Sequence, residues 1–374
     1  MSPAPLVLHV LEALEGGTAR HVADVTRWVE EVRHEVVVPP RRVGGVTDEQ
    51  AVDVMRDNGA VVHLLDMRRQ PLRPENAVAV ARLAALVRRR HPDIVHAHST
   101  IGGIVGRIAS LSAPTRRVYT AHALAPGRGP LAVERGLGRF TDRWIAVSPS
   151  EADLVRRHRI IAPESVAVIP NGIDLDPPPP VPGLRSSMGI PADVPLIGCL
   201  ARLVPQKDPL AFVRLCRHLS TRLPNARFLL IGSGPLRAEV ERLVDASGLR
   251  VTFLLRAFLP HAALALGELD VFVLTSRFEG CPYSALEAIR AGVPVVLSDV
   301  VGNRDVVESG VSGVLVPPGD DLAAAAAVAG LLADPELRLR LVAGGRARLA
   351  RRFDVHIMAG ALGRLYAELS RSEA

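Results

Sequence analysis

The amino-acid sequence predicts an α/β protein of two domains, each built on a parallel β-sheet. The chain has 374 residues, too many for one ordinary hydrophobic core and enough for two domains. Short β-branched runs alternate with amphipathic stretches through both halves of the chain, a pattern typical of strands joined by crossover helices. A run of four prolines separates the two halves.

The first half contains seven candidate strands, all short and rich in β-branched residues. They are Leu6–Leu11, Glu35–Val38, Val61–Leu65, Ile94–His98, Arg117–Thr120, Trp144–Val147 and Val166–Ile169. Amphipathic stretches lie between several of them, and Glu75–Arg90 carries apolar residues at helical spacing. Strands that alternate with helices indicate a parallel sheet with helices on both faces.

A stiff linker is predicted over residues 170–183, which read PNGIDLDPPPPVPG. Four consecutive prolines cannot join a helix or a central strand. We therefore expect an N-terminal domain at 1–176 and a C-terminal domain at 177–354. A last helix, over 355–374, is expected to pack back on the N-terminal domain.

The second half repeats the pattern with six candidate strands. They are Leu196–Leu200, Arg227–Ile231, Val251–Leu255, Val271–Leu274, Pro294–Ser298 and Gly313–Val316. A helix is predicted over Tyr283–Ala291, with Gly292 as its C-cap. Ligands of open parallel sheets bind at the carboxyl ends of the strands, so the loops there should hold the chemistry.

Composition excludes several classes of protein. Aromatic residues make up only 3%, too few for the stacking platforms of a nucleic-acid binder, so no nucleic-acid partner is expected. The net charge of +6 suggests anionic partners such as nucleotides or lipid phosphates. Three cysteines without CxxC spacing argue against a disulfide framework or a zinc knuckle. No signal peptide or membrane span is predicted, so we expect a cytoplasmic protein; contact with the inner face of the membrane stays open.

Lysine usage singles out one position. The chain has a single lysine, Lys207, among 45 cationic residues. It lies five residues after Arg202, just beyond a predicted strand, where a planar guanidinium and a flexible ammonium can straddle a diphosphate. Two solvated surface charges are the alternative reading of this pair.

The richest segment is 275–300, TSRFEGCPYSALEAIRAGVPVVLSDV. Glu279 lies in a loop after a predicted strand, and Glu287 lies in the helix that follows. The amides of Tyr283, Ser284 and Ala285 open that helix, and a helix N-terminus favours an anion such as a diphosphate. A carboxylate such as Glu287 suits ribose hydroxyls, and Glu279 suits sugar hydroxyls.

Other motifs are weaker by themselves. The Gly16-Gly17 turn lets a backbone approach a ligand, and His122 follows a strand end, where it is a candidate for contacting a transferred sugar. His96-x-His98 places two imidazoles on one side of a strand, which favours cleft lining or packing over a metal because no third ligand is evident. Asp174-x-Asp176 resembles a metal–diphosphate motif, but it precedes the prolines and reads as a turn.

Taken in order, these motifs resemble glycosyltransferase family 4, the retaining enzymes of the GT-B fold, over nearly the whole chain. The motifs are GG at 16–17, HAHS at 96–99, TAH at 120–122, AVSPSE at 146–151, PNGID at 170–174, RLVPQKD at 202–208, IGSGP at 231–235, EGCPYSALEA at 279–288 and GVPVVLSDVVGN at 292–303. The stretch at 95–110 is similar to the subgroup that builds bacterial exopolysaccharides and lipid-linked glycans. The resemblance implies two Rossmann-like domains whose parallel sheets face a central cleft.

The resemblance also implies roles for individual residues. Arg202 and Lys207 would bind the donor phosphates, Glu279 the donor sugar and Glu287 the ribose. The backbone around Cys281 would lie beside the sugar, and His122 would contact it near the reaction centre. The remaining residues expected to line the donor site are Gly17, Gly234, Tyr283, Ser284 and Ala285.

The implied function is metal-independent retaining transfer of a sugar from a nucleotide-diphosphate donor to a glycan, lipid-linked or small-molecule acceptor, without a further cofactor. Two rivals are a nucleotide-sugar epimerase of the same fold and a non-catalytic nucleotide-sugar-binding protein. The sequence departs from the subgroup in two places. ALAPGRGP follows His122 where an aromatic residue is common, and Leu255-Arg256 stands where many members have a glycine. The acceptor and the base therefore stay open.

Overall fold

The computed structural model describes residues 4–12, 14, 16–40, 49–68, 70–176, 183–257 and 262–371. They form two compact units. Unit 1 comprises the chain up to Gly172 together with the C-terminal segment from Val355, and unit 2 runs from Ile173 to Asp354. The chain thus enters unit 2 four residues before the predicted boundary at 176. The proline run at 177–180 lies outside the described residues.

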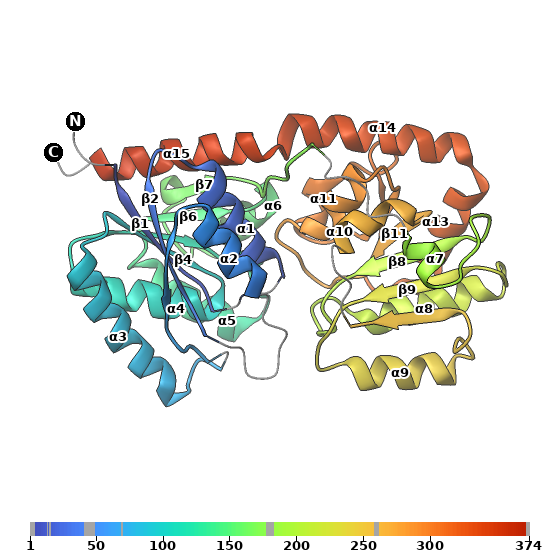
Figure 1. Cartoon of the computed structure of the whole chain (residues 1–374), viewed down its shortest axis with the longest axis horizontal. Coiled ribbons are helices and arrows are strands. Elements are labelled where there is room, and N and C mark those ends of the chain that lie inside the picture. Colours follow the sequence, from blue (N-terminus) through green and yellow to red (C-terminus); the bar gives the residue numbers. More distant parts are fainter. Residues whose placement is uncertain are drawn as a thin grey trace. The chain divides into compact units, whose positions relative to one another are not determined.

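Unit 1 is a seven-stranded, wholly parallel sheet in the order β3-β2-β1-β4-β5-β6-β7. Figure 1 colours this unit from blue at β1 to green at β7, with α15 in red. Its strands are β1 (Leu6–Val10), β2 (Arg33–Val38), β3 (Val61–Leu64), β4 (Ile94–His98), β5 (Arg116–Thr120), β6 (Arg143–Ala146) and β7 (Val166–Val168). Its helices are α1 (Gly16–Trp28), α2 (Glu49–Asp57), α3 (Pro74–Arg90), α4 (Thr100–Ala109), α5 (Arg128–Gly138), α6 (Pro149–Arg157) and α15 (Val355–Arg371), with short 3₁₀ turns at Ser110–Ser112 and Pro163–Ser165.

Helix α15 completes unit 1, although it comes from the far end of the chain. Its apolar side chains Met358, Leu362 and Tyr366 are buried in one core cluster with Val7 and Ile94 of the central strands. The C-terminal segment therefore packs on the N-terminal sheet by burying the apolar face of an amphipathic helix.

Unit 2 is a six-stranded parallel sheet in the order β10-β9-β8-β11-β12-β13. Its strands are β8 (Leu196–Leu200), β9 (Arg227–Ile231), β10 (Phe253–Arg256), β11 (Val271–Leu274), β12 (Val295–Ser298) and β13 (Val314–Val316). Its helices are α7 (Leu184–Ser187), α8 (Pro209–Ser220), α9 (Arg237–Ala246), α10 (Ala262–Ala265), α11 (Tyr283–Arg290), α12 (Asn303–Val306), α13 (Asp321–Ala333) and α14 (Pro335–Arg352), with a 3₁₀ turn at Leu266–Glu268.

The predicted α/β class, with two parallel sheets, is confirmed. All the predicted strands are present, and the largest shifts are two residues, at β2, which begins at Arg33 rather than Glu35, and at β10, which begins at Phe253 rather than Val251. Gly292 has φ 79° just after α11, as a C-terminal glycine should. Helix α1 begins at Gly16, so Gly16 and Gly17, predicted as a turn, form the start of this helix. Within the described residues, no helix is both long enough and apolar enough to cross a membrane.

Candidate functional site

The unit 2 site lies at the carboxyl ends of its central strands. Strand β8 has β9 on one side and β11 on the other, so the chain order reverses direction between β8 and β11. Such a reversal leaves a crevice at the carboxyl edge of an open parallel sheet, where ligands bind. Lys207 follows β8 and Glu279 follows β11, so the two predicted residues flank this point.

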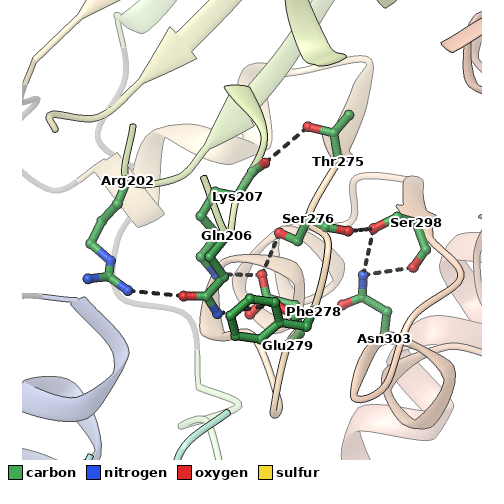
Figure 2. Close-up of polar contacts among 9 residues, drawn as sticks. All are labelled: Arg202, Gln206, Lys207, Thr275, Ser276, Phe278, Glu279, Ser298 and Asn303. Carbon is green, nitrogen blue, oxygen red and sulfur yellow. Dashed lines mark hydrogen bonds and ion pairs between the residues drawn. The ribbon is translucent and has the colours of Figure 1, made fainter. Parts of the chain in front are cut away.

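Lys207 and Glu279 form an ion pair through Nζ and Oε1 (Figure 2). The side chain of Lys207 is 14% exposed and that of Glu279 is 4% exposed. Ser276 Oγ also donates to Glu279 Oε1, at 2.5 Å. The sequence predicted separate partners for these two residues, the phosphates and the sugar. The structure joins them, because a carboxylate so well buried needs a cation beside it.

Arg202 lies on the loop that leads from β8 toward Lys207. Its guanidinium donates to Gln206 Oε1 at 3.5 Å, and Gln206 Nε2 donates to the Phe278 carbonyl at 3.1 Å (Figure 2). The backbone of Gln206 also accepts from the Arg277 amide at 2.8 Å. Gln206 thus ties the loop of Arg202 to the loop of Glu279, a role that the sequence did not indicate.

The IGSGP turn after β9 supports the same loop from the other side. The amide of Leu203 donates to the Ser233 carbonyl at 2.8 Å. A Cβ on Gly232 would lie 1.9 Å from the Ala201 carbonyl oxygen, and one on Gly234 would lie 2.4 Å from that of Leu203. Both glycines are therefore required by the close approach of two backbones. Gly234 thus lies against the loop that carries Arg202.

The N-terminus of α11 presents the other predicted donor contacts. Pro282 is the N-cap and supplies no side-chain cap. The amide of Ala285 donates to the Pro282 carbonyl at 3.2 Å, so this amide is engaged inside the helix, unlike the sequence expectation. Tyr283 and Ser284 occupy the first two helical positions, and Ser284 is partly exposed. The remaining two predicted residues are both buried, with Cys281 at 4% and Glu287 at 8% exposure.

Three residues that shape the Glu279 loop were missed by the sequence analysis. Ser298, at the end of β12, donates to the Ser276 carbonyl, and Asn303 Nδ2 donates to the Ser298 carbonyl at 2.9 Å (Figure 2). Gly302 has φ 86°, and a Cβ there would lie 2.3 Å from the Gly280 carbonyl oxygen. The motif GVPVVLSDVVGN contains Ser298, Gly302 and Asn303, but only the tertiary structure reveals that they brace this loop.

Unit 1 has its own reversal of strand order, between β1 and β4. Gly17 lies there, exposed in the first turn of α1. Next to it, Thr18 Oγ1 and Ser99 Oγ lie 3.2 Å apart and share a hydrogen bond. This edge of unit 1 thus carries Gly17 where a backbone approach to a ligand is possible.

His122 follows β5 at the same edge, with φ 62°. Its Nε2 lies 3.1 Å from His98 Nδ1, and its own Nδ1 is buried without a hydrogen-bond partner among the described residues. His96 and His98 lie on one side of β4, with ring centroids 4.0 Å apart, and both are fully buried. His96 packs with Tyr366 and Thr120, at 2.7 and 2.8 Å from its two ring nitrogens. Of the two alternatives predicted for His96, cleft lining and packing, the structure therefore shows packing.

The Asp174-x-Asp176 motif is a turn, as predicted. Asp174 Oδ1 accepts from the Asp176 amide at 3.1 Å, and the contact is exposed. A side chain that bonds the backbone two residues ahead stabilises a turn.

Comparison with known proteins places both units in one class of enzyme. The family model described as "Glycosyltransferase Family 4" matches residues 15–177, and the model described as "Glycosyl transferases group 1" matches residues 182–348. A D-inositol 3-phosphate glycosyltransferase of Xylanimonas cellulosilytica is 34% identical over 307 residues, which cover 75% of this chain and 72% of that enzyme.

A galactosyltransferase of Escherichia coli, which is named for UDP-Gal and α-D-GlcNAc-diphosphoundecaprenol, is 29% identical over 64% of this chain and 66% of its own. Among solved structures, Anabaena HepE in complex with UDP-glucose superposes with a TM-score of 0.83 at 21% identity, covering 97% of this chain and 99% of that one. A sucrose-phosphate synthase of Thermosynechococcus elongatus superposes with a TM-score of 0.82 at 23% identity, covering 98% and 99%. These structures are similar in fold.

Proposed function

The chain belongs to glycosyltransferase family 4, with a group 1 C-terminal half, and from this premise we propose that it moves a sugar from a nucleoside-diphosphate donor with retention of anomeric configuration. Unit 2 would hold the donor, and unit 1 would bind the acceptor and contribute Gly17 and His122. The observation that carries the proposal is the Lys207–Glu279 pair at the reversal of strand order in unit 2. One member suits the diphosphate and the other suits the hydroxyls of the sugar attached to it.

Catalysis would depend on stabilising the leaving diphosphate. Arg202, Lys207 and the amides of Tyr283 and Ser284 supply positive charge where the phosphate oxygens gain negative charge. Glu279 is held by Lys207 and Ser276, so in the free protein it is not placed as an unpaired nucleophile. This arrangement favours same-face attack of the acceptor hydroxyl over a double displacement through a glycosyl-enzyme.

We expect transfer activity to survive chelation of divalent metals. Arg202 and Lys207 would supply fixed positive charge to the diphosphate, and the Asp174-x-Asp176 motif is an exposed turn. Initial rates would be compared with and without EDTA, with the protein first dialysed against the chelator. A loss of activity that Mn²⁺ or Mg²⁺ restores would contradict the metal-free mechanism.

We expect the two glutamates to differ in which ligand they hold. Glu287→Ala should weaken binding of the free nucleoside diphosphate, because the ribose contact exists without a sugar. Glu279→Ala should spare the free nucleotide and weaken the intact donor. Each charge-assisted hydrogen bond contributes roughly 1.5–3 kcal/mol, on the order of 10–150-fold in affinity. Calorimetry with nucleotide and donor would reveal the pattern, and the reverse pattern would exchange the two roles.

The proposed acceptor is inferred from the names of relatives. The Escherichia coli relative carries a lipid-diphosphate acceptor in its name, and another relative is named putative glycosyltransferase EpsD of Bacillus subtilis. We propose a glycan, lipid-linked or small-molecule acceptor, since the Escherichia coli relative is named for a lipid diphosphate and the Xylanimonas relative for D-inositol 3-phosphate. A saturation-transfer NMR screen of nucleotide sugars would first identify the donor. Hydrolysis and transfer assays with and without candidate acceptors would then separate a transferase from an epimerase or a binding protein.

A further inference from the structure

Four histidines on one face of the unit 1 sheet form a continuous line across adjacent strands. His34 lies on β2, His9 on β1, His98 on β4 and His122 just after β5, and these four strands are neighbours in the sheet. The register pairs His34 with Val7, His9 with His96, and His98 with Thr120. On each successive strand, the histidine lies two residues further along than the residue that is paired with the previous histidine. The four rings therefore form a diagonal line that ends at the carboxyl edge of the sheet.

The rings are joined by hydrogen bonds at every step. His34 Nδ1 lies 3.1 Å from His9 Nε2, and His9 Nδ1 lies 3.1 Å from His98 Nε2. His98 Nδ1 lies 3.1 Å from His122 Nε2. At the inner end, His34 Nε2 lies 2.7 Å from the carbonyl oxygen of Val29.

The hydrogen bond of His34 at the inner end decides which ring donates and which accepts at every step of the line. The Val29 carbonyl can only accept, so His34 Nε2 must carry a proton. Burial lowers the pKa of all four rings below the ordinary value of 6.5, so each is a neutral imidazole with one N–H and one lone pair. His34 Nδ1 is then an acceptor, which requires His9 to donate from Nε2. The same reasoning makes His98 and His122 donors through Nε2 and leaves the lone pair of His122 on Nδ1.

We propose that His34, His9 and His98 are positioning residues that hold His122 in its Nε2–H tautomer and keep its Nδ1 as a hydrogen-bond acceptor for a hydroxyl group of the bound ligand. That Nδ1 is buried and has no hydrogen-bond partner among the residues that the structure describes, an arrangement that costs free energy until a donor reaches it. A neutral acceptor suits a sugar hydroxyl and disfavours a phosphate or carboxylate oxygen, which needs a donor. The hydroxyl's identity as part of a sugar donor rests on the proposed function.

Two other readings of these rings are less well supported. The line of hydrogen-bonded rings ends on the carbonyl of Val29, which cannot take up a proton. The line therefore does not relay protons through the sheet. Two groups of three rings, His9 with His96 and His98, and His21 with His98 and His122, have ligand atoms within 4.8 Å of one another, as a metal site would need. Both groups contain His98, whose one lone pair already accepts the hydrogen bond from His122, so a metal at either place would have to break that bond.

The test reads the tautomer of His122 directly, by long-range ¹H–¹⁵N NMR of the full-length protein labelled in histidine. His122→Asn identifies its signals by their loss. We expect the wild-type protein to show a protonated Nε2 and a bare Nδ1. His34→Phe removes the acceptor that sets the direction and should give a mixture of His122 tautomers. His34→Gln can still donate to Val29 and accept from His9, so it should restore the single form.

His96→Gln is the matched control, because His96 is buried in the same core but bonds Thr120 and Tyr366 instead of the chain. It should leave the His122 tautomer unchanged, and thermal melts would show that each variant is folded. A protonated Nδ1 in the wild type, an unchanged single tautomer in folded His34→Phe, or stoichiometric Zn²⁺ binding that displaces the His98–His122 bond would each overturn the proposal.

Ligand binding supplies the second readout. With whichever nucleotide sugar the donor screen identifies, the Nδ1 signal should shift, and His34→Phe should weaken binding about 2- to 12-fold, as expected for one neutral hydrogen bond. His34→Gln should recover most of that affinity. If no nucleotide sugar binds, the proposed function fails while the tautomer result stands. If a nucleotide sugar binds without shifting Nδ1, the assignment of the acceptor fails instead.

Discussion

Replacing Lys207 by alanine is expected to lower turnover by roughly 100-fold or more at saturating donor, provided that the ammonium's contact strengthens as the diphosphate departs. Lys207 is the single lysine of a chain with 45 cationic residues, and it lies at the reversal of strand order in unit 2. Replacement by arginine keeps the charge but exchanges a compact ammonium for a broad planar guanidinium. The loss of turnover should therefore be smaller, and it would measure the effect of geometry alone. Steady-state rates with saturating donor provide the measurement.

Because Lys207 is paired with Glu279, replacing Lys207 also lowers the stability of the folded protein. Removing Lys207 leaves a carboxylate that is only 4% exposed without its cation, and breaking such a pair costs roughly 3 kcal/mol or more. Rates must therefore be measured well below the melting temperature of the variant. The double variant Lys207→Met with Glu279→Gln removes both charges and should recover stability without recovering turnover.

Arg214→Ala is a matched control for the loss of one cation. Arg214 pairs with Asp321 in the same unit, at a more exposed position, and has no place in the proposed site. Its turnover should equal that of the wild type. If Lys207→Arg also behaves as the wild type, the lone lysine has no geometric role. If folded Lys207→Ala keeps full turnover, the assignment to the donor phosphates is wrong.

The strands were predictable because they are short apolar runs, and those at the centre of each sheet are buried almost throughout. Their alternation with helices along the chain indicated parallel sheets. The contacts of the site were not predictable in the same way. Lys207 and Glu279 are 72 residues apart, and nothing in their spacing indicates that they pair. Gly302 is needed only because another loop passes 2.3 Å from where its Cβ would lie. Such contacts depend on loop conformations, which periodicity does not describe.

The line of hydrogen-bonded histidines is a second feature that the sequence predicted only in part. Alternation predicted that His96 and His98 share a side of β4, which is correct. Their different partners follow from strand order and register, which place β1 on one side of β4 and β5 on the other. Sequence alone therefore located the imidazoles on a sheet without revealing that one line of them reaches the carboxyl edge.

Acid is expected to unfold unit 1 at an unusually high pH. Burial lowers the pKa of His21 to about 4 and holds those of His9, His96, His98 and His122 well below 6.5. Among the described residues, no carboxylate is a hydrogen-bond or ion-pair partner of these rings, so none offsets the charge of an added proton.

In the unfolded chain the same five rings titrate near 6.5, so below that pH the unfolded state binds more protons than the folded one and stability falls as pH falls. Each ring that stays neutral contributes up to about 1.4 kcal/mol per pH unit, so the five together contribute roughly 6 kcal/mol per unit near pH 5.5. Total stabilities are typically about 5–15 kcal/mol, so unfolding is expected about one to two pH units below 6.5.

The measurement is urea unfolding at a series of pH values, followed by tryptophan fluorescence. Both tryptophans, Trp28 and Trp144, belong to unit 1, so the signal reports that unit alone. His96→Gln removes one titrating ring and should flatten the pH dependence by about 1.4 kcal/mol per unit at most. Stability that stays constant from pH 7.5 to 5.5 would mean that the rings are charged or solvated in the folded protein. A loss confined to pH below about 4.5 would instead assign acid unfolding to carboxylates, whose ordinary pKa values lie there.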